Sequence, residues 1–330
     1  ESFMFNSLSR VLVIAQKDLL YARRDAFFLL LTLFIATSAL IAVLTGSIAL
    51  ATDVATYNDA KETLLALGKS LNSIAAPEFY PLKLLRGAIE QIEILGAVVG
   101  ILVGFRTVIA ERGNQVLALI LTRPIARHEF IAGKVLAGFG LISLSLFLVF
   151  SLLTAVLALS SGVGISVDDL IRILITWGLA SVYVGGFFLL SFALCIKFKR
   201  SSNALLASFI IWLLIVLIAP QVGDTLDPDN QVAGGVFKQL HIPKAEQNRI
   251  KASYATYETM RNGIEISSIT KHFERVSFAV LGIKDTYTGK KLQPILAEKR
   301  SDIFWIVLFF LSLILVVFTQ KINFQQLTKE

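Results

Sequence analysis

The stretch that decides how this chain is organised runs from Glu111 to Lys134 and reads ERGNQVLALILTRPIARHEFIAGK. It separates two long apolar segments, so we expect it to lie as a loop at a membrane surface. Apolar residues recur in it at helical spacing until Pro124 ends the run. These apolar residues are Val116, Leu117, Ile120 and Leu121. The pattern predicts a short helix over 113–123 that lies flat against the membrane and is bordered by cations.

Composition places the whole chain in a membrane. Of its 330 residues, 55% are hydrophobic and 17% are charged, whereas soluble domains average about 45–50% apolar and 25% charged residues. Apolar runs of about 20 residues, long enough to cross a bilayer, recur along the chain. The runs are continuous and do not alternate with polar residues, which favours helices over a β-barrel. The fold class is therefore predicted as an all-α polytopic membrane protein.

Six membrane-spanning helices account for these runs. The predicted spans are about 26–50, 89–109, 135–159, 171–196, 203–219 and 303–320. This divides the chain into an amphipathic connecting helix (1–25), spans one to five (26–220), a helical extracytoplasmic domain (221–302), and span six with a short tail (303–330). The extracytoplasmic domain is marginal in size for a core of its own. We expect it to lean on the 51–85 segment, which should carry a short surface helix, on the membrane, or on a partner.

The segment before the first span has two distinct faces. Arg10, Lys17 and Arg24 recur every seventh residue and share one face of a helix, and apolar residues occupy another. This pattern is typical of an interfacial helix that lies in the headgroup region. It also serves as a positive-inside anchor, and the two roles are compatible.

The distribution of cations sets the orientation. Lys and Arg are found in the head of the chain, the 111–134 loop, the 197–200 turn and the tail, whereas the 160–169 turn has two Asp and no cation. The positive-inside rule then places both termini in the cytoplasm of a multi-pass cell-membrane protein. It also explains the net charge of +7 without nucleic-acid binding.

Nothing in the sequence has the spacing of a catalytic or metal site. There is one cysteine, the three histidines are far apart, and no Gly-rich phosphate loop is complete. We therefore expect no enzymatic activity, no metal and no cofactor on this chain. Any energy for its work must come from another chain or from a gradient.

Two acidic residues near span two are the strongest intramembrane candidates. Glu90 and Glu93 are three residues apart, hence on the same side of a regular helix. A buried carboxylate costs about 2.5–3.5 kcal/mol on insertion scales, so truly buried acids should face the bundle interior. Alternatively, the span begins near Ile94 and both acids lie in the outer headgroups, which the nearby Arg86 favours.

Further polar and small positions near the ends and middle of the spans also have predicted roles. Arg106 should extend to the inner surface, and Arg172 should join Asp168 and Asp169 in a polar rim at the outer surface. Tyr183, Gly185 and Gly186 allow close helix approach between subunits, or they face lipid or serve ordinary packing.

The 111–134 stretch resembles the cytoplasmic loop of ABC-2-type permeases. That family has a run of the form E.GT…P..R.E…GK, and this chain follows it except at Asn114, where Thr is usual. The loop forms a coupling helix in the family. The resemblance assigns ATPase coupling to Glu111, Arg112, Gly113, Leu117, Thr122, Arg123, Pro124, Arg127, Glu129 and Lys134.

The resemblance implies a transmembrane subunit of a type V-like ABC exporter, similar to the permeases that accompany nitrous-oxide-reductase maturation. Two copies, as a homodimer, would bind two separate ATP-binding subunits, which hold the ATP and Mg. Nucleotide-driven closure of those subunits would move the 113–123 helix and export or mechanically release a substrate. The alternatives are a gradient-driven secondary transporter that uses Glu90 and Glu93, or a membrane anchor that recruits an extracytoplasmic protein.

Overall fold

The computed structural model describes residues 2–67, 80–113, 126–160, 165–221, 240, 244–253, 256, 259–260, 263–264, 267–284 and 286–320. Within these residues the chain is helical and contains no strand. Six helices are long and apolar enough to cross a membrane, which confirms the predicted fold class. They span Ala26–Ile48, Pro81–Ala110, Arg127–Leu159, Val167–Lys197, Ser201–Gln221 and Arg300–Thr319.

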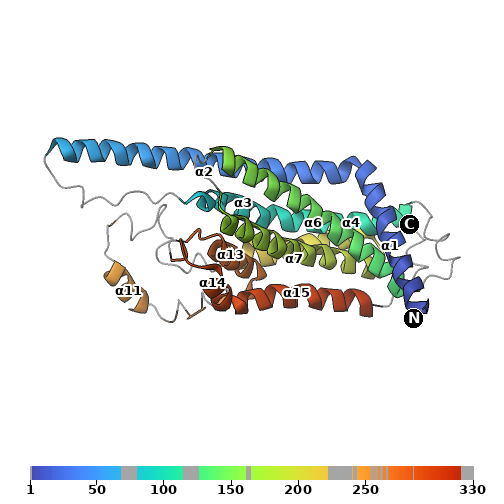
Figure 1. Cartoon of the computed structure of the whole chain (residues 1–330). Coiled ribbons are helices and arrows are strands. Elements are labelled where there is room, and N and C mark those ends of the chain that lie inside the picture. Colours follow the sequence, from blue (N-terminus) through green and yellow to red (C-terminus); the bar gives the residue numbers. More distant parts are fainter. Residues whose placement is uncertain are drawn as a thin grey trace.

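Helix α7 (Val167–Lys197) forms the centre of the bundle and is the most buried of the six spans. Around it pack α4 (Ala97–Gly113), α6 (Arg127–Ser160), α8 (Ser201–Trp212) and α15 (Arg300–Thr319) (Figure 1). Its first turn is fixed by a capping box, in which Ser166 and Asp169 bind each other's backbone N–H groups.

A stripe of glycines brings α4 and α7 into backbone contact. A Cβ atom added at Gly100 would lie 2.5 Å from the carbonyl oxygen of Val184, and one at Gly104 would lie 2.4 Å from that of Phe188. Gly96, one turn earlier, faces the Val184 side chain at 3.0 Å. Small residues four apart allow this approach. Close van der Waals packing then stabilises the association of the two helices, because the hydrophobic effect does not drive helices together in lipid.

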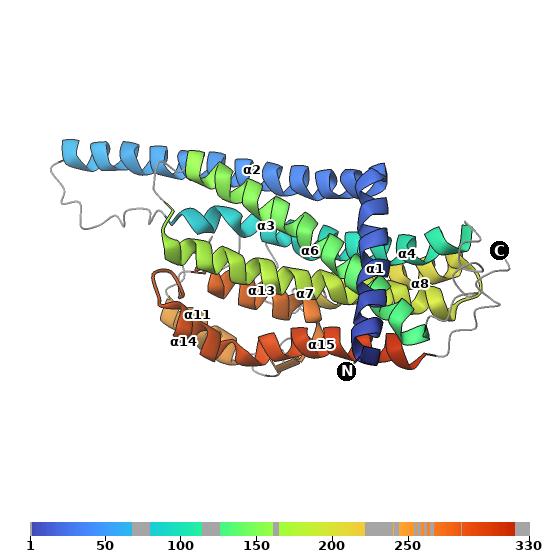
Figure 2. The same ribbon diagram turned by 45° about the vertical axis from the view of Figure 1, so that its right-hand side comes forward.

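Helix α1 (Ser2–Arg24) crosses the end of the bundle nearly at right angles to the spans (Figure 2). It packs mainly against the first turns of α6, and Asp25 separates it from α2 (Ala26–Ala66). The last turn of α4, the first turn of α6, residues 198–200 and the last turn of α15 lie at the same end. We call this the α1 end of the bundle.

The opposite end is built from α2, the start of span two and the segment before α15. Helix α13 (Ile269–Val280) is almost wholly buried and packs on α15, α7 and α3 (Arg86–Gln91). The short α14 (Leu292–Glu298) joins it to α15, and α11 (Lys244–Ser253) lies farther out. The described part of the predicted 221–302 domain that includes α13 is therefore continuous with the core of the bundle.

The predicted first span, about 26–50, agrees with the membrane-length apolar segment Ala26–Ile48. Helix α2 itself continues beyond this segment without a break to Ala66, since residues 51–66 contain no proline or glycine. It projects beyond the ends of α6 and α7 (Figure 1), so this stretch is not a separate surface helix. Span two begins at Pro81 and not near 89, through a 3-10 turn, η2 (Pro81–Leu85), whose leucines are buried.

A π-helical turn interrupts two of the spans. Span two contains η3 (Ile92–Gly96) between α3 and α4, and the fifth span contains η4 (Leu213–Ile218) after α8. Such turns widen the helix by one residue and frequently mark functional positions.

Candidate functional site

The base of α6 is joined to α1 through Glu129. One of its carboxylate oxygens, Oε2, accepts the backbone N–H of Ala126 at 3.0 Å and lies 3.3 Å from Nη1 of Arg10. The first contact satisfies a free donor at the start of the helix, and the second binds a helix 119 residues away in the sequence. Glu129 is only 3% exposed, so its charge is used within the chain.

Gly133 and Lys134 form the second contact between the same two helices. Nζ of Lys134 lies 2.7 Å from a carboxylate oxygen of Asp18, and Lys134 is 3% exposed. A Cβ atom at Gly133 would lie 2.7 Å from the Cβ of Ile14, so α1 can approach only because this residue is glycine. We call the set Arg10, Asp18, Glu129, Gly133 and Lys134 the α1–α6 lock.

A third ion pair ties the start of α2 to α4. The carboxylate of Asp25 accepts the backbone N–H of Phe27 at 3.0 Å and lies 3.1 Å from Nη2 of Arg106. The Phe27 N–H, and then Arg106, hold the pKa of Asp25 below its usual value although partial burial opposes this. Arg106 reaches the α1 end of the bundle, and its guanidinium also lies over the Phe27 ring at 5.4 Å.

The remaining predicted coupling residues flank or fall within residues 114–125. Glu111, Arg112 and Gly113 form the last turn of α4, and their side chains are not described. Leu117, Thr122, Arg123 and Pro124 lie outside the described residues, so the predicted helix over 113–123 is untested beyond Gly113.

Arg127 opens α6 immediately after this segment. Its Nε and Nη2 atoms are buried and have no hydrogen-bond partner among the described atoms. Buried guanidinium donors normally find partners. Among the described residues of the predicted coupling set, Arg127 thus has hydrogen-bond donors on two nitrogen atoms that no described group accepts.

The two acidic candidates of span two are separated by the structure. Glu90 pairs with Arg86 at 3.0 Å, and its side chain is 45% exposed, whereas Glu93 is only 8% exposed. The two acids therefore differ in exposure, and the start of the π-helical turn at Ile92 lies between them. The helix that contains both acids begins at Pro81, and the depth of the two carboxylates in the membrane stays a prediction.

The main chain of Glu93 is anchored to α7. Its carbonyl oxygen accepts the hydroxyl of Tyr183 at 2.9 Å, and this hydroxyl also lies 3.4 Å from Oγ1 of Thr270 on α13. The Tyr183 ring stacks on Phe273 at 4.6 Å. Irregular backbone at membrane depth needs such partners, so Tyr183 holds together span two, α7 and α13.

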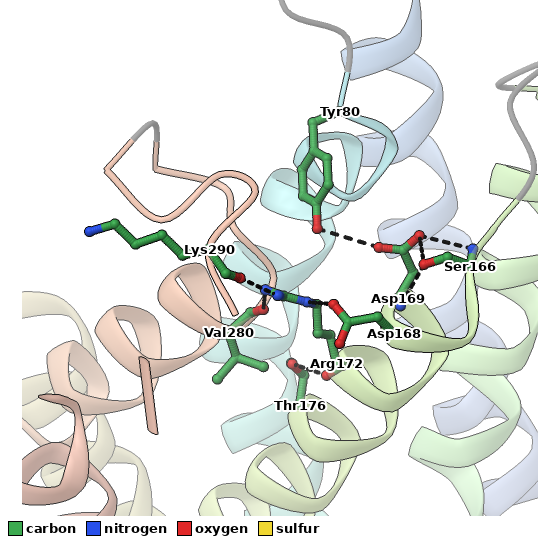
Figure 3. Close-up of polar contacts among 8 residues, drawn as sticks. All are labelled: Tyr80, Ser166, Asp168, Asp169, Arg172, Thr176, Val280 and Lys290. Atoms are coloured by element: carbon green, nitrogen blue, oxygen red, sulfur yellow. Dashed lines mark hydrogen bonds and ion pairs between the residues drawn. The ribbon is translucent and has the colours of Figure 1, made fainter. Parts of the chain in front are cut away.

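The prediction that Arg172 lies in a polar rim at the outer surface is wrong. Arg172 is buried, with only 2% of its surface exposed. Figure 3 shows its guanidinium between two carbonyl groups and a carboxylate. It donates to the oxygens of Val280 at 2.9 Å and Lys290 at 2.5 Å, and Nε binds Asp168 at 2.6 Å. These contacts bind the end of α13 and the following turn to α7. Sequence reasoning missed the burial because the covering segment is more than 100 residues away.

Asp169 completes the same cluster at the start of α7. Its carboxylate accepts the N–H and the hydroxyl of Ser166, at 3.0 Å and 2.7 Å, and the hydroxyl of Tyr80 at 3.3 Å (Figure 3). Burial raises the pKa of Tyr80, so it remains a neutral donor. The cluster therefore links span two, α7 and the segment after α13.

Gly185 and Gly186 serve packing within the chain. A Cβ atom at Gly185 would lie 2.9 Å from ring atoms of Phe139 and of Phe310, and one at Gly186 would lie 2.2 Å from Phe309. They receive aromatic side chains of α6 and α15. The stronger signal, the spacing of Gly96, Gly100 and Gly104 along span two, was present in the sequence and was missed.

No metal-ligand cluster stands out in the described ranges: no group of three or more His, Cys, Asp or Glu side chains there could hold an ion. The polar clusters consist of paired charges and main-chain hydrogen bonds. These clusters join helices to one another. They connect the α1 end mechanically to the interior of the bundle.

Comparison with known proteins gives one clear match. A family model described as ABC-2 family transporter protein matches residues 12–320. The match includes most of α1, all six spans and α13. A search of curated proteins found no match.

Proposed function

Because the chain belongs to the ABC-2 family of transporter proteins, we propose that it is the permease subunit of an ABC exporter whose ATP is hydrolysed by a separate subunit. Two copies of the chain pair in the membrane, and each binds one ATP-binding subunit, which holds ATP and Mg. The chain lies in the cell membrane, and its α1 end faces the cytoplasm, in accord with the positive-inside rule and the cations at that end. The product of each cycle is export or mechanical release of a substrate.

The observation that carries this proposal is how the helices on either side of residues 114–125 are connected. This segment joins α4 to α6 at the α1 end. Arg127, with unpartnered donors on two nitrogens, directly follows it. Beyond Arg127 the α1–α6 lock makes α1 and the base of α6 one unit. A force applied to residues 114–125 would therefore move α1 and the base of α6 together.

The interior of the bundle offers a route for that force. The glycine stripe joins α4 to α7 at backbone distance, and close packing of this kind transmits displacement. Tyr183 and Arg172 then join α7 to α13. In the proposed cycle, nucleotide binding favours one of two arrangements of these helices, because the ATP-binding pair fits that arrangement better.

Co-purification with the ATP-binding subunit tests the proposal. Arg123→Glu reverses a cation in the segment assigned to the contact. We expect the complex to be lost or weakened at least about tenfold, since charge-assisted contacts contribute roughly 1.5–3 kcal/mol. Arg86→Glu, at the opposite end of the molecule, is the matched control and should leave the complex intact. Equal recovery of both variants would contradict the assignment.

The burial of Glu93 supports a second candidate, a transporter driven by an ion gradient. A carboxylate within a span is costly and commonly belongs to an ion or proton path. This candidate predicts transport by the chain alone in liposomes with an imposed gradient, abolished by Glu93→Gln and not by Glu90→Gln. Transport that requires ATP and the second subunit excludes it.

A further inference from the structure

A cavity of about 230 Å³ lies at the α1 end of the bundle, beside the ion pairs of Lys134 and Arg106. Its walls come from α1, the first turn of α2, the end of α4 and the base of α6. It exceeds the roughly 150 Å³ of a cavity that holds a benzene ring. The lining residues are Lys17, Asp18, Tyr21, Phe28, Arg106, Thr107, Ala110, Lys134, Ala137, Gly138 and Leu141.

One part of this cavity is cationic. Lys17, Arg106 and Lys134 line it, against the single carboxylate of Asp18. Lys134 pairs with Asp18, and Arg106 pairs through Nη2 with Asp25 just outside the lining. The cations thus outnumber the carboxylates in the cavity lining itself. The Nε atom of Arg106 is buried without a hydrogen-bond partner, so the guanidinium keeps a donor that no group in the described part of the chain accepts.

The other part of the cavity is apolar and lies deeper among the spans. Phe28, Ala137 and Leu141 form this wall, together with Gly138. Leu141 follows Lys134 by seven residues on α6, or about 10 Å along the helix axis. The cavity thus passes from charged to apolar in the direction of the bilayer interior, which matches the polarity of an amphiphile.

We propose that this cavity binds an anionic phospholipid, with its phosphate at Arg106 and Lys17 and an acyl chain against Phe28 and Leu141. An arginine presents donors in a geometry suited to phosphate oxygens. A bound lipid would touch α1, α2, α4 and α6 together, and so would reinforce the contacts that hold α1 on the bundle. The site goes beyond the proposed function, because it requires neither the ATP-binding subunit nor transport.

Native mass spectrometry of the full chain tests the proposal. The protein is taken from vesicles of phosphatidylcholine with a minor share of phosphatidylglycerol, and its bound lipids are counted. We expect phosphatidylglycerol to be retained in preference to phosphatidylcholine. Arg106→Gln should weaken this retention about tenfold, the usual effect of losing a charge-assisted contact. Arg86→Gln, which removes a paired arginine at the other end, should not.

A second variant separates binding from folding. Ala110→Leu fills the cavity and keeps every charge, and it should also lose the lipid, whereas Ala158→Leu on the exposed face of α6 should retain it. Inorganic phosphate is the competing probe, and it should displace the lipid poorly because it has no acyl chain. Equal retention by wild type, Arg106→Gln and Ala110→Leu would overturn the proposal, as would full displacement by inorganic phosphate.

Discussion

The buried charged side chains of this protein are joints between helices that lie far apart in the sequence. Glu129 and Lys134 bind residues of α1, and Arg172 binds carbonyl groups of the segment after α13. An unpaired charge at such depth is costly, so each joint selects one arrangement of its helices. The sequence indicated which residues carry charge in apolar surroundings. It did not indicate their partners, because these depend on how distant helices meet.

The glycine stripe makes a prediction at the scale of single atoms. Gly104→Ala places a methyl group 2.4 Å from the carbonyl oxygen of Phe188. Such overpacking should destabilise the protein by about 1–3 kcal/mol, seen as a lower midpoint of thermal unfolding in detergent. Gly140→Ala has open space around the new methyl group and should stabilise its helix by up to about 1 kcal/mol. An unchanged midpoint in Gly104→Ala would show that α4 and α7 are not in backbone contact.

Arg172 makes a second prediction at this scale. Arg172→Lys keeps the positive charge but cannot reach Asp168 and the carbonyl groups of Val280 and Lys290 together. Each hydrogen bond lost from a charged donor costs roughly 1.5–3 kcal/mol, so thermal stability should fall clearly. Arg86→Lys changes an exposed pair and should shift the midpoint little. Similar stability of the two variants would contradict the buried role of Arg172.

At the scale of elements, the contact of α1 with α6 accounts for part of the 111–134 stretch. Its final residues, Glu129, Gly133 and Lys134, are buried against α1 and hold it across the bundle. Glu129 and Gly133 are four residues apart and share one face of α6, and Lys134 directly follows Gly133. We therefore assign them to positioning, and leave direct contact with the ATP-binding subunit to Arg123 and the residues around it.

A charge exchange tests this assignment. Asp18→Lys or Lys134→Asp alone replaces a native ion pair of 2.7 Å by two like charges in a largely buried site, which should cost about 3–5 kcal/mol. The double variant restores an opposite pair and should recover most of the lost thermal stability. The same exchange at Arg86 and Glu90, an exposed pair, should have little effect in any combination. Absence of recovery in the double variant would argue against a specific joint.

Helix type and number could be predicted from the sequence, but several boundaries could not. Runs of apolar residues identified each span because lipid demands that length and composition. Helix α2 exceeded its run because residues 51–66 are polar without being helix breakers, and hydropathy alone does not stop a helix. The π-helical turn at Ile92 leaves no mark in composition, so it could not be foreseen.

At the scale of the whole molecule, the structure has a centre in α7 with the more exposed spans around it. Within the predicted 221–302 domain, the apolar face of α13 completes the core beside Tyr183. The family match across residues 12–320 includes this helix, so we expect it to take part in the proposed cycle.

The central claim is that a separate ATP-binding subunit contacts this chain through the segment between α4 and α6. The most direct measurement is site-specific crosslinking in membranes, in a Cys195→Ala background that removes the native thiol. With a cysteine at Leu117, we predict a crosslink to the ATP-binding subunit that depends on nucleotide. With a cysteine at Leu65, exposed at the far end of α2, we predict none. A crosslink from position 65, or labelling of position 117 from the outside of sealed cells, would contradict the account.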